Sequence, residues 1–188
     1  ACAAILFFDH LRFLSLPFFW DELGQFVPSA LDIWRDGAWV PHSAVPNAHP
    51  PGVMAYLALV WSFFGYSIPV TRAAMLALAA TLALVSFLLA NRLGVSSGRA
   101  SACLATLLLL ADPLFHAQAM MAQLDMPAAL FATLSLLLFL EDRQRWTVAA
   151  CTLLVLVKET GVVVPLLCAL VLWRDPRLSE ALRYGIPF

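Results

Sequence analysis

Two adjacent carboxylates, Asp21 and Glu22, directly follow an aromatic cluster near the start of the chain. The cluster spans residues 16–20 (Leu-Pro-Phe-Phe-Trp), and aromatic side chains favour the interface between lipid and water. A carboxylate there could act as a general base, taking a proton from a hydroxyl group as it attacks an electrophile. A structural interpretation is also open, in which Asp21 caps a helix and Glu22 complements its dipole.

Two basic side chains and one more acid could support such chemistry. Lys158 is the only lysine and lies between apolar runs, so it could contact a leaving phosphate or simply pair with neighbouring Glu159. Arg72 is a second candidate for phosphate binding, with interfacial anchoring as the alternative. Asp125 could form a second acidic site or cap the helix that follows it.

The histidines add potential metal ligands. His49 begins a His-Pro-Pro-Gly turn and could contact a phosphate or ligate a metal. Together with Asp21 and Asp125 it forms the candidate ligand set for a divalent metal ion as cofactor. His116 taken alone is interpreted as a loop residue rather than a ligand.

The composition indicates a membrane protein. Hydrophobic residues make up 62% of the 188 residues and charged residues 12%, and the mean hydropathy is +0.86. A water-soluble domain of this size would have too few polar side chains to cover its surface, whereas helices that face lipid need none there. The net charge of −1 and the lack of a basic tract argue against nucleic acid as a partner.

Apolar windows predict an all-α fold built as a polytopic transmembrane helix bundle. The expected spans are about 69–91, 100–121, 126–140 and 147–173. The last is too long for one helix, and the Lys-Glu-Thr-Gly sequence at 158–161 should divide it into two segments. Trp61, Trp146 and Trp173 are predicted to be interface anchors.

Positive charge predicts the orientation, because cytoplasmic loops retain arginine and lysine. Most of the eleven basic residues fall in the connections that would share one side. Those connections hold Arg92, Arg99, Arg143, Arg145, Arg174, Arg177 and Arg183. The opposite, external side then receives the segment from about 9 to 68, the turn at 112–125 and the Lys158 turn.

The first external loop, residues 17–68, is longer than a simple connection requires. Apolar residues recur at helical spacing from about 22 to 36, with polar residues on the opposite face, which predicts an amphipathic interfacial helix that Pro28 could kink. After the His49 turn, residues 53–64 predict a second short apolar helix that lies flat. The loop therefore carries amphipathic juxtamembrane helices.

Several motifs occur in one order. The first external loop has an Asp-Glu pair after the first span, an amphipathic helix ending in Asp36-Gly-Ala-Trp, the His49 turn and a short helix ending in Phe64-Gly65. Arg72 then opens a long span, an aspartate opens another at 125, and a Lys-Glu-Thr-Gly turn follows at 158. This order resembles the GT-C superfamily of membrane glycosyltransferases, with the protein O-mannosyltransferases and aminoarabinose lipid A transferases as the nearest relatives. The resemblance covers the whole chain as the N-terminal part of one transmembrane domain. It implies that residues 1–16 end a first span and that 174–188 form a cytoplasmic loop leading to further spans.

The resemblance also implies an activity: transfer of a sugar from a polyprenyl-phosphate donor to a lipid, glycan or protein acceptor at the external face of the plasma (inner) membrane. Asp21 matches the family's acid-base residue, and Glu22 is the accompanying catalytic candidate. Donor phosphate binding would fall to Lys158, Arg72 and His49, although the family more often has lysine near that last position. These 188 residues alone are not expected to be active.

Two other classes of function remain open. A transporter or channel could use Asp125 and Lys158 to line a polar pathway. A non-catalytic membrane scaffold could retain the same helices. The long external loop argues against the transporter, and the Asp21-Glu22 pair argues against the scaffold.

Overall fold

The structure, a computed structural model, describes residues 2–44, 49–94 and 98–174. These residues contain helices and no strand, which confirms the predicted all-α class. The helices are α1 Cys2–His10, the 3-10 helix η1 Leu11–Phe13, the π-helix η2 Glu22–Phe26, α2 Val27–Asp36, α3 Gly52–Phe64, α4 Ile68–Leu93, α5 Gly98–Ala111, α6 Pro113–Gln118, α7 Asp125–Leu140, α8 Gln144–Val157, the 3-10 helix η3 Glu159–Val162 and α9 Val163–Arg174.

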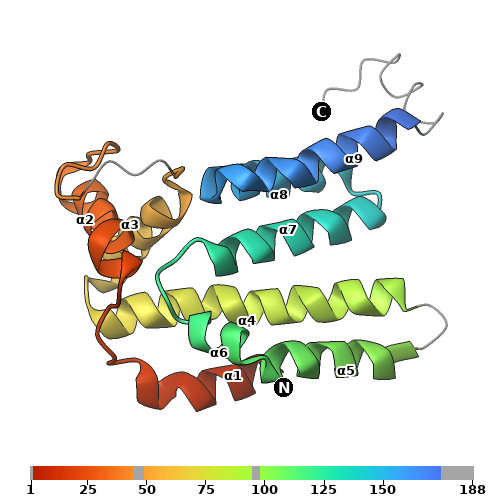
Figure 1. Ribbon diagram of the computed structural model, residues 1–188, viewed down its shortest axis with the longest axis horizontal. Coiled ribbons are helices and arrows are strands. Elements are labelled where there is room, and N and C mark those ends of the chain that lie inside the picture. Colours follow the sequence, from red (N-terminus) through yellow and green to blue (C-terminus); the bar gives the residue numbers. More distant parts are fainter. Residues whose placement is uncertain (1, 45–48, 95–97, 175–188) are drawn as a thin grey trace.

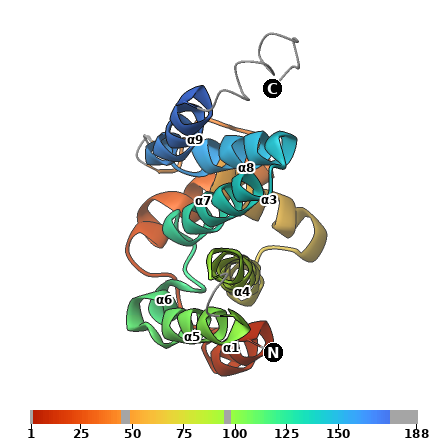
Figure 2. The same ribbon diagram turned by 90° about the vertical axis from the view of Figure 1, so that its right-hand side faces the viewer.

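The longer helices lie side by side along the long axis of the molecule (Figure 1). Viewed along that axis they stack one above another, from α1 and α5 through α4 and α7 to α8 and α9 (Figure 2). α4 packs against α1, α5 and α7, and α7 packs against α8. α2 and α3 gather at the end of the stack where α4, α7 and α9 begin (Figure 1, left).

Local sequence signals explain where these helices begin and end. Ser67 caps α4 by accepting a hydrogen bond from the N–H of Val70 at 3.3 Å, and Asp112 caps α6 by accepting from two backbone N–H groups. α2 ends at Gly37, whose φ of +66° lies in the left-handed region that glycine adopts without strain. The expected amphipathic helix at 22–36 is therefore present as two pieces, η2 and α2.

Only part of the expected set of spans matches the described helices. α4 has 26 residues, matches the span expected at 69–91, and is the one described helix that is long and apolar enough to cross a membrane. The span expected at 100–121 is interrupted at Asp112, where α5 ends and α6 begins. α7, α8 and α9 have 16, 14 and 12 residues, so the polytopic bundle is not confirmed. The division of 147–173 at 158–162 is confirmed.

Two apolar clusters hold the fold together. One lies where α1, α6 and α7 meet α4, and the other lies beneath α2 and α3. Trp61 belongs to the second cluster and is only 1% exposed, so its predicted role as an interface anchor is wrong. Its indole N–H instead donates to the hydroxyl of Thr71 at 3.0 Å, which satisfies the one polar group of a buried tryptophan. Trp146 and Trp173 are exposed.

Candidate functional site

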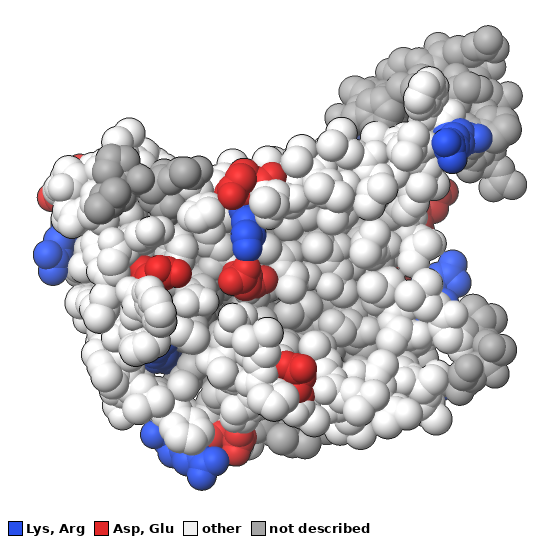
Figure 3. All heavy atoms as spheres, in the orientation of Figure 1, with Lys and Arg blue, Asp and Glu red and all other residues white. Residues whose placement is uncertain are grey.

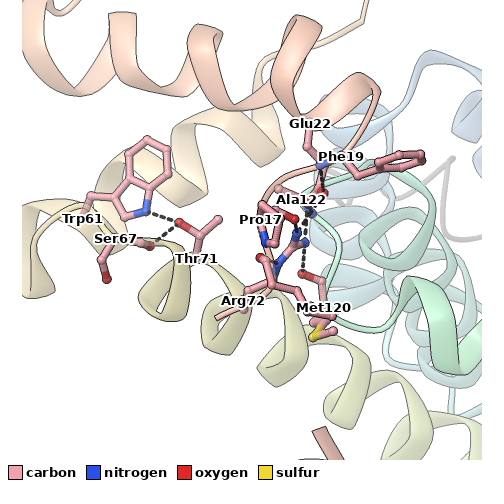
Figure 4. A network of polar contacts seen from close by, with 10 residues as sticks. Pro17, Phe19, Glu22, Trp61, Ser67, Thr71, Arg72, Met120 and Ala122 are labelled. Atoms are coloured by element: carbon pink, nitrogen blue, oxygen red, sulfur yellow. Dashed lines mark hydrogen bonds and ion pairs between the residues drawn. The ribbon is translucent and has the colours of Figure 1, made fainter. Parts of the chain in front are cut away.

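Glu22 and Arg72 form a buried ion pair. Glu22 is 0% exposed and Arg72 is 3% exposed. Nη1 of Arg72 lies 2.5 Å from Oε1 of Glu22, and Nη2 lies 3.0 Å from Oε2, so the contact is bidentate (Figure 4). The guanidinium also lies 5.2 Å from the ring centroid of Phe18.

The remaining donors of Arg72 bind backbone carbonyls. Nη2 donates to Pro17 at 2.8 Å and Nη1 donates to Met120 at 3.0 Å, while Nε lies 3.4 Å from the Leu16 carbonyl. Each of these carbonyls belongs to a segment far from Arg72 in the sequence. The arginine, which was predicted to bind a donor phosphate, therefore joins the start of the first loop and the 119–124 turn to α4.

The acceptor sites of Glu22 are filled in the same way. Its Oε2 accepts from the N–H of Phe19 at 2.9 Å, and its Oε1 accepts from the N–H of Ala122 at 2.6 Å. Two N–H donors and a bidentate arginine therefore occupy the acceptor sites of this buried carboxylate. This geometry gives Glu22, which was predicted as a catalytic residue, the role of an anchor for its neighbour Asp21.

Asp21 has the opposite environment. Its side chain is exposed, and it makes no hydrogen bond or ion pair with any residue that the structure describes. The residue before it, Trp20, has a φ of +50°, which is strained for a side chain of that size. The segment after it is the π-helix η2, a form that often occurs at functional sites. The local backbone thus holds a free carboxylate next to a rigid, buried one.

Lys158 pairs with Asp125 rather than with its neighbour Glu159. Its Nζ lies 2.5 Å from Oδ1 of Asp125, and the two side chains are 29% and 53% exposed. Both residues remain accessible to a ligand, and their pairing brings the start of α7 to the junction of α8 and η3. Asp125 does not cap its helix with its side chain, because it is the first helical residue and Leu124 holds the N-cap position without a side-chain bond.

His49 contacts Glu159 from the other side of this junction. Its Nδ1 lies 2.9 Å from Oε2 of Glu159, and its ring centroid lies 6.2 Å from that of Phe26. The hydrogen bond with His49, supported by a backbone hydrogen bond, lowers the pKa of Glu159. His49 is thus held near Lys158 by a carboxylate.

The predicted site segments converge at one end of the helix stack. In Figure 3 acidic and basic side chains lie next to one another near the start of α7, and further charged side chains are scattered over the same face. Four contacts link these segments into a ring. They join Glu22 to Ala122, Asp125 to Lys158, Glu159 to His49, and His49 to Phe26. The chain itself closes the gaps in this ring, because Ala122 leads into α7, Lys158 adjoins Glu159, and Phe26 ends the π-helix that Glu22 begins.

An apolar cavity of about 340 Å³ lies beside the charged groups, between α3, α7 and α8. Pro51, Pro127 and Val157 line it, and each is one or two residues from His49, Asp125 or Lys158. Gly52 allows α3 to approach α8 this closely, because a Cβ atom there would collide with the Leu156 carbonyl. The volume of the cavity lies within the range of small-molecule sites.

The expected metal ligands do not assemble. Among the described residues, Asp21, His49 and Asp125 do not form a group that one ion could bridge. Two other groups have that spacing: Asp32, Asp36 and His42 at the end of α2, and Asp9, His10 and His116 at the end of α1. The Asp-His pair that ends the first apolar run is the sequence signal for the second group, and its partner His116 lies more than 100 residues away.

Asp32 fixes the loop that follows α2. Its Oδ2 accepts from the N–H groups of His42 and Ser43 at 2.9 and 3.0 Å, and its Oδ1 accepts from the Ser43 hydroxyl at 2.7 Å. Burial alone raises the pKa of Asp32, but the hydrogen bonds from Ser43 and His42 together outweigh burial and hold the pKa below its ordinary value of 3.8.

The Asp32→Asn variant is expected to unfold more easily at neutral pH, by about 1 to 3 kcal/mol, because an amide has one acceptor oxygen instead of two. Since the folded pKa of Asp32 lies below the unfolded one, the carboxylate stabilises the fold fully above the unfolded value and loses this effect as the pH falls through the folded value. Melting temperatures measured from pH 7 down to about pH 3 should therefore fall more steeply for the wild type than for the variant. Parallel curves would contradict this role.

Comparison with protein-family models, curated proteins and solved structures finds no match for this chain. Its function is therefore inferred from the geometry described above.

Proposed function

We propose that this chain is part of a multi-pass membrane glycosyltransferase that moves a sugar from a polyprenyl-phosphate donor to a lipid, glycan or protein acceptor at the external membrane face. The observation that carries the proposal is the contrast between the two adjacent acids. Glu22 is buried and fully paired, whereas Asp21 is exposed and unpaired among the described residues. A rigidly supported carboxylate without a partner is suited to act as a base.

Membrane residence is supported by the distribution of charge along the helices. The segments 73–91, 100–111, 126–140 and 146–157 contain no charged residue. Leucine and valine side chains on α5, α8 and α9 are exposed, a condition that suits lipid better than water. The short helices would be accommodated by local thinning of the bilayer.

The donor fits the amphiphilic character of the proposed site. The apolar cavity between α3, α7 and α8 is suited to isoprenoid carbons, and Lys158 at its border is suited to the phosphate. In the reaction, the acceptor oxygen forms a bond to the anomeric carbon while the bond from that carbon to the phosphate oxygen breaks. The electron pair leaves with the phosphate, whose negative charge is stabilised by Lys158 and by a hydrogen bond from His49, and the acceptor proton passes to Asp21.

The Lys158→Ala variant of the full-length protein tests the proposal. Purified protein in detergent, supplied with a polyprenyl-phosphate sugar and an acceptor, should transfer the sugar. The variant should bind the donor about 10-fold or more weakly, because one charge-assisted hydrogen bond to the phosphate is lost. The measurement is the KM for the donor together with direct binding of the polyprenyl phosphate.

Asp125→Asn is the matched control, because it removes the partner of Lys158 but keeps the ammonium group. It should weaken donor binding less than Lys158→Ala does. Equal donor affinity in the wild type and in Lys158→Ala would contradict phosphate binding by this lysine. A wild type that is inactive in detergent but moves a solute across vesicles would favour the transporter instead.

A further inference from the structure

His10 is a buried imidazole whose two nitrogens both face carbonyl oxygens. The residue is 1% exposed. Its Nδ1 lies 2.8 Å from the carbonyl oxygen of Leu6, one turn back in α1, and its Nε2 lies 3.0 Å from the carbonyl oxygen of His116 at α6. The second contact joins the first helix to α6.

A neutral imidazole cannot satisfy both contacts. It carries one N–H group, whereas both carbonyls can only accept hydrogen bonds. With the proton on Nδ1, where the contact to Leu6 is shorter, the lone pair of Nε2 points at a carbonyl oxygen in a buried site. This arrangement needs a positive centre that both atoms can bind. It is either a second proton between them or a metal ion to one side of the line that joins them, because the two atoms are only 3.0 Å apart.

Two further ligand groups lie around the same point. Nε2 of His116 lies 3.1 Å from Oδ2 of Asp9, and the rings of His10 and His116 are 4.2 Å apart between centroids. One ligand atom from each of these three residues lies within 4.8 Å of the other two. Ligands about 2.1 Å from one ion in tetrahedral geometry would be about 3.4 Å apart, compared with 3.1 Å between Nε2 of His116 and Oδ2 of Asp9.

We propose that Asp9, His10 and His116 bind a divalent transition-metal ion, with zinc as the best match. Two imidazoles and one carboxylate suit zinc and its neighbours better than magnesium or calcium, which prefer oxygen. The bond from Nδ1 of His10 to Leu6 is the carbonyl contact that typically orients a metal-bound histidine. Arg12 lies 3.5 Å from Oδ1 of Asp9 and leaves Oδ2 for the metal.

The site is open to its surroundings on one side. The side chains of His116 and Asp9 are 40% and 42% exposed, so an ion could enter there and keep water at its remaining positions. The ion would fix α6, which leads into the turn whose Met120 carbonyl and Ala122 N–H bind Arg72 and Glu22. Metal binding would therefore stabilise the turn that holds Glu22, the residue next to Asp21, without any contact between the ion and Asp21.

The test is zinc binding by the metal-stripped full-length protein in detergent, measured by competition with a chelating dye and by calorimetry. Asp9→Asn and His116→Asn change exposed side chains and should fold. Each should bind zinc at this site at least about 10-fold more weakly than the wild type. His42→Asn, which changes the other histidine and carboxylate group, is the matched control and should keep the wild-type affinity.

Three results would overturn the proposal. The first is the same zinc affinity and stoichiometry in the wild type, Asp9→Asn and His116→Asn. The second is loss of a zinc ion in His42→Asn alone. The third is a melting temperature that rises with acidity in metal-free protein but does not respond to zinc, which would assign the positive centre to a second proton on His10.

Discussion

The Asp21→Asn variant of the full-length protein is expected to lose sugar transfer by about 10²- to 10⁴-fold, the usual contribution of a general base. The amide has nearly the same shape as the carboxylate but cannot take the acceptor proton. Because Asp21 is exposed and unpaired among the described residues, the variant should fold and melt like the wild type. Initial transfer rates with a saturating polyprenyl-phosphate donor, together with melting curves, measure both effects.

Asp36→Asn is the matched control for this experiment. Asp36 is another exposed carboxylate of the first loop, and the same substitution removes the same charge. It should leave transfer nearly unchanged. Undiminished transfer by Asp21→Asn would remove Asp21 from the reaction, and an equal loss in both variants would indicate that the loop needs negative charge in general rather than a base at one position.

The local features of the first loop could be predicted from the sequence because their causes are local. The amphipathic repeat at 22–36, the short helix at 53–64 and the break at 158–161 follow from periodicity, glycine and charge, and all three are present. The lengths of the apolar helices were predicted less well. Asp112 followed by proline is a local signal that predicts the end of a span, and α5 ends at Ala111 directly before it. The apolar composition continues beyond this point, which is why the span expected from composition extends to residue 121.

The pairing of charged groups was the main feature that sequence reasoning missed. The structural alternative predicted for Lys158 was an ion pair with its neighbour Glu159, because adjacent residues are the only pairs that a sequence displays. The partner is Asp125, 33 residues away, and Glu159 binds His49 across 110 residues. Such pairs depend on how helices stack, which periodicity does not specify.

The two acids at 21 and 22 illustrate the same limit. Their adjacency predicted a shared catalytic role, yet the backbone turns one side chain inward and leaves the other outside. One sequence signal for this division existed. An arginine near the start of an apolar helix needs a counter-charge, and Arg72 opens α4 on the expected external side, where most of the acids of the chain fall.

Removal of Arg72, the counter-charge of Glu22, has the largest expected effect on stability. Arg72→Met should destabilise the fold by about 3 to 5 kcal/mol, because Glu22 would remain buried without its partner. Glu22→Gln should destabilise it for the converse reason. The double variant, Glu22→Gln with Arg72→Met, removes both charges and should recover a substantial part of the loss, since no buried charge is left unpaired.

Unfolding in detergent by heat and by denaturant measures these differences, and Arg92→Met is the matched control because Arg92 is exposed at the other end of α4. The control should melt like the wild type. The experiment also separates the two roles considered for Arg72. If Arg72 binds the donor phosphate, its substitution should weaken donor binding while the fold keeps its stability. If Arg72 pairs with Glu22, its substitution should destabilise the fold. The double variant should then be more stable than the sum of the two single effects predicts. Additive effects of the two substitutions would show that Glu22 and Arg72 do not stabilise one another.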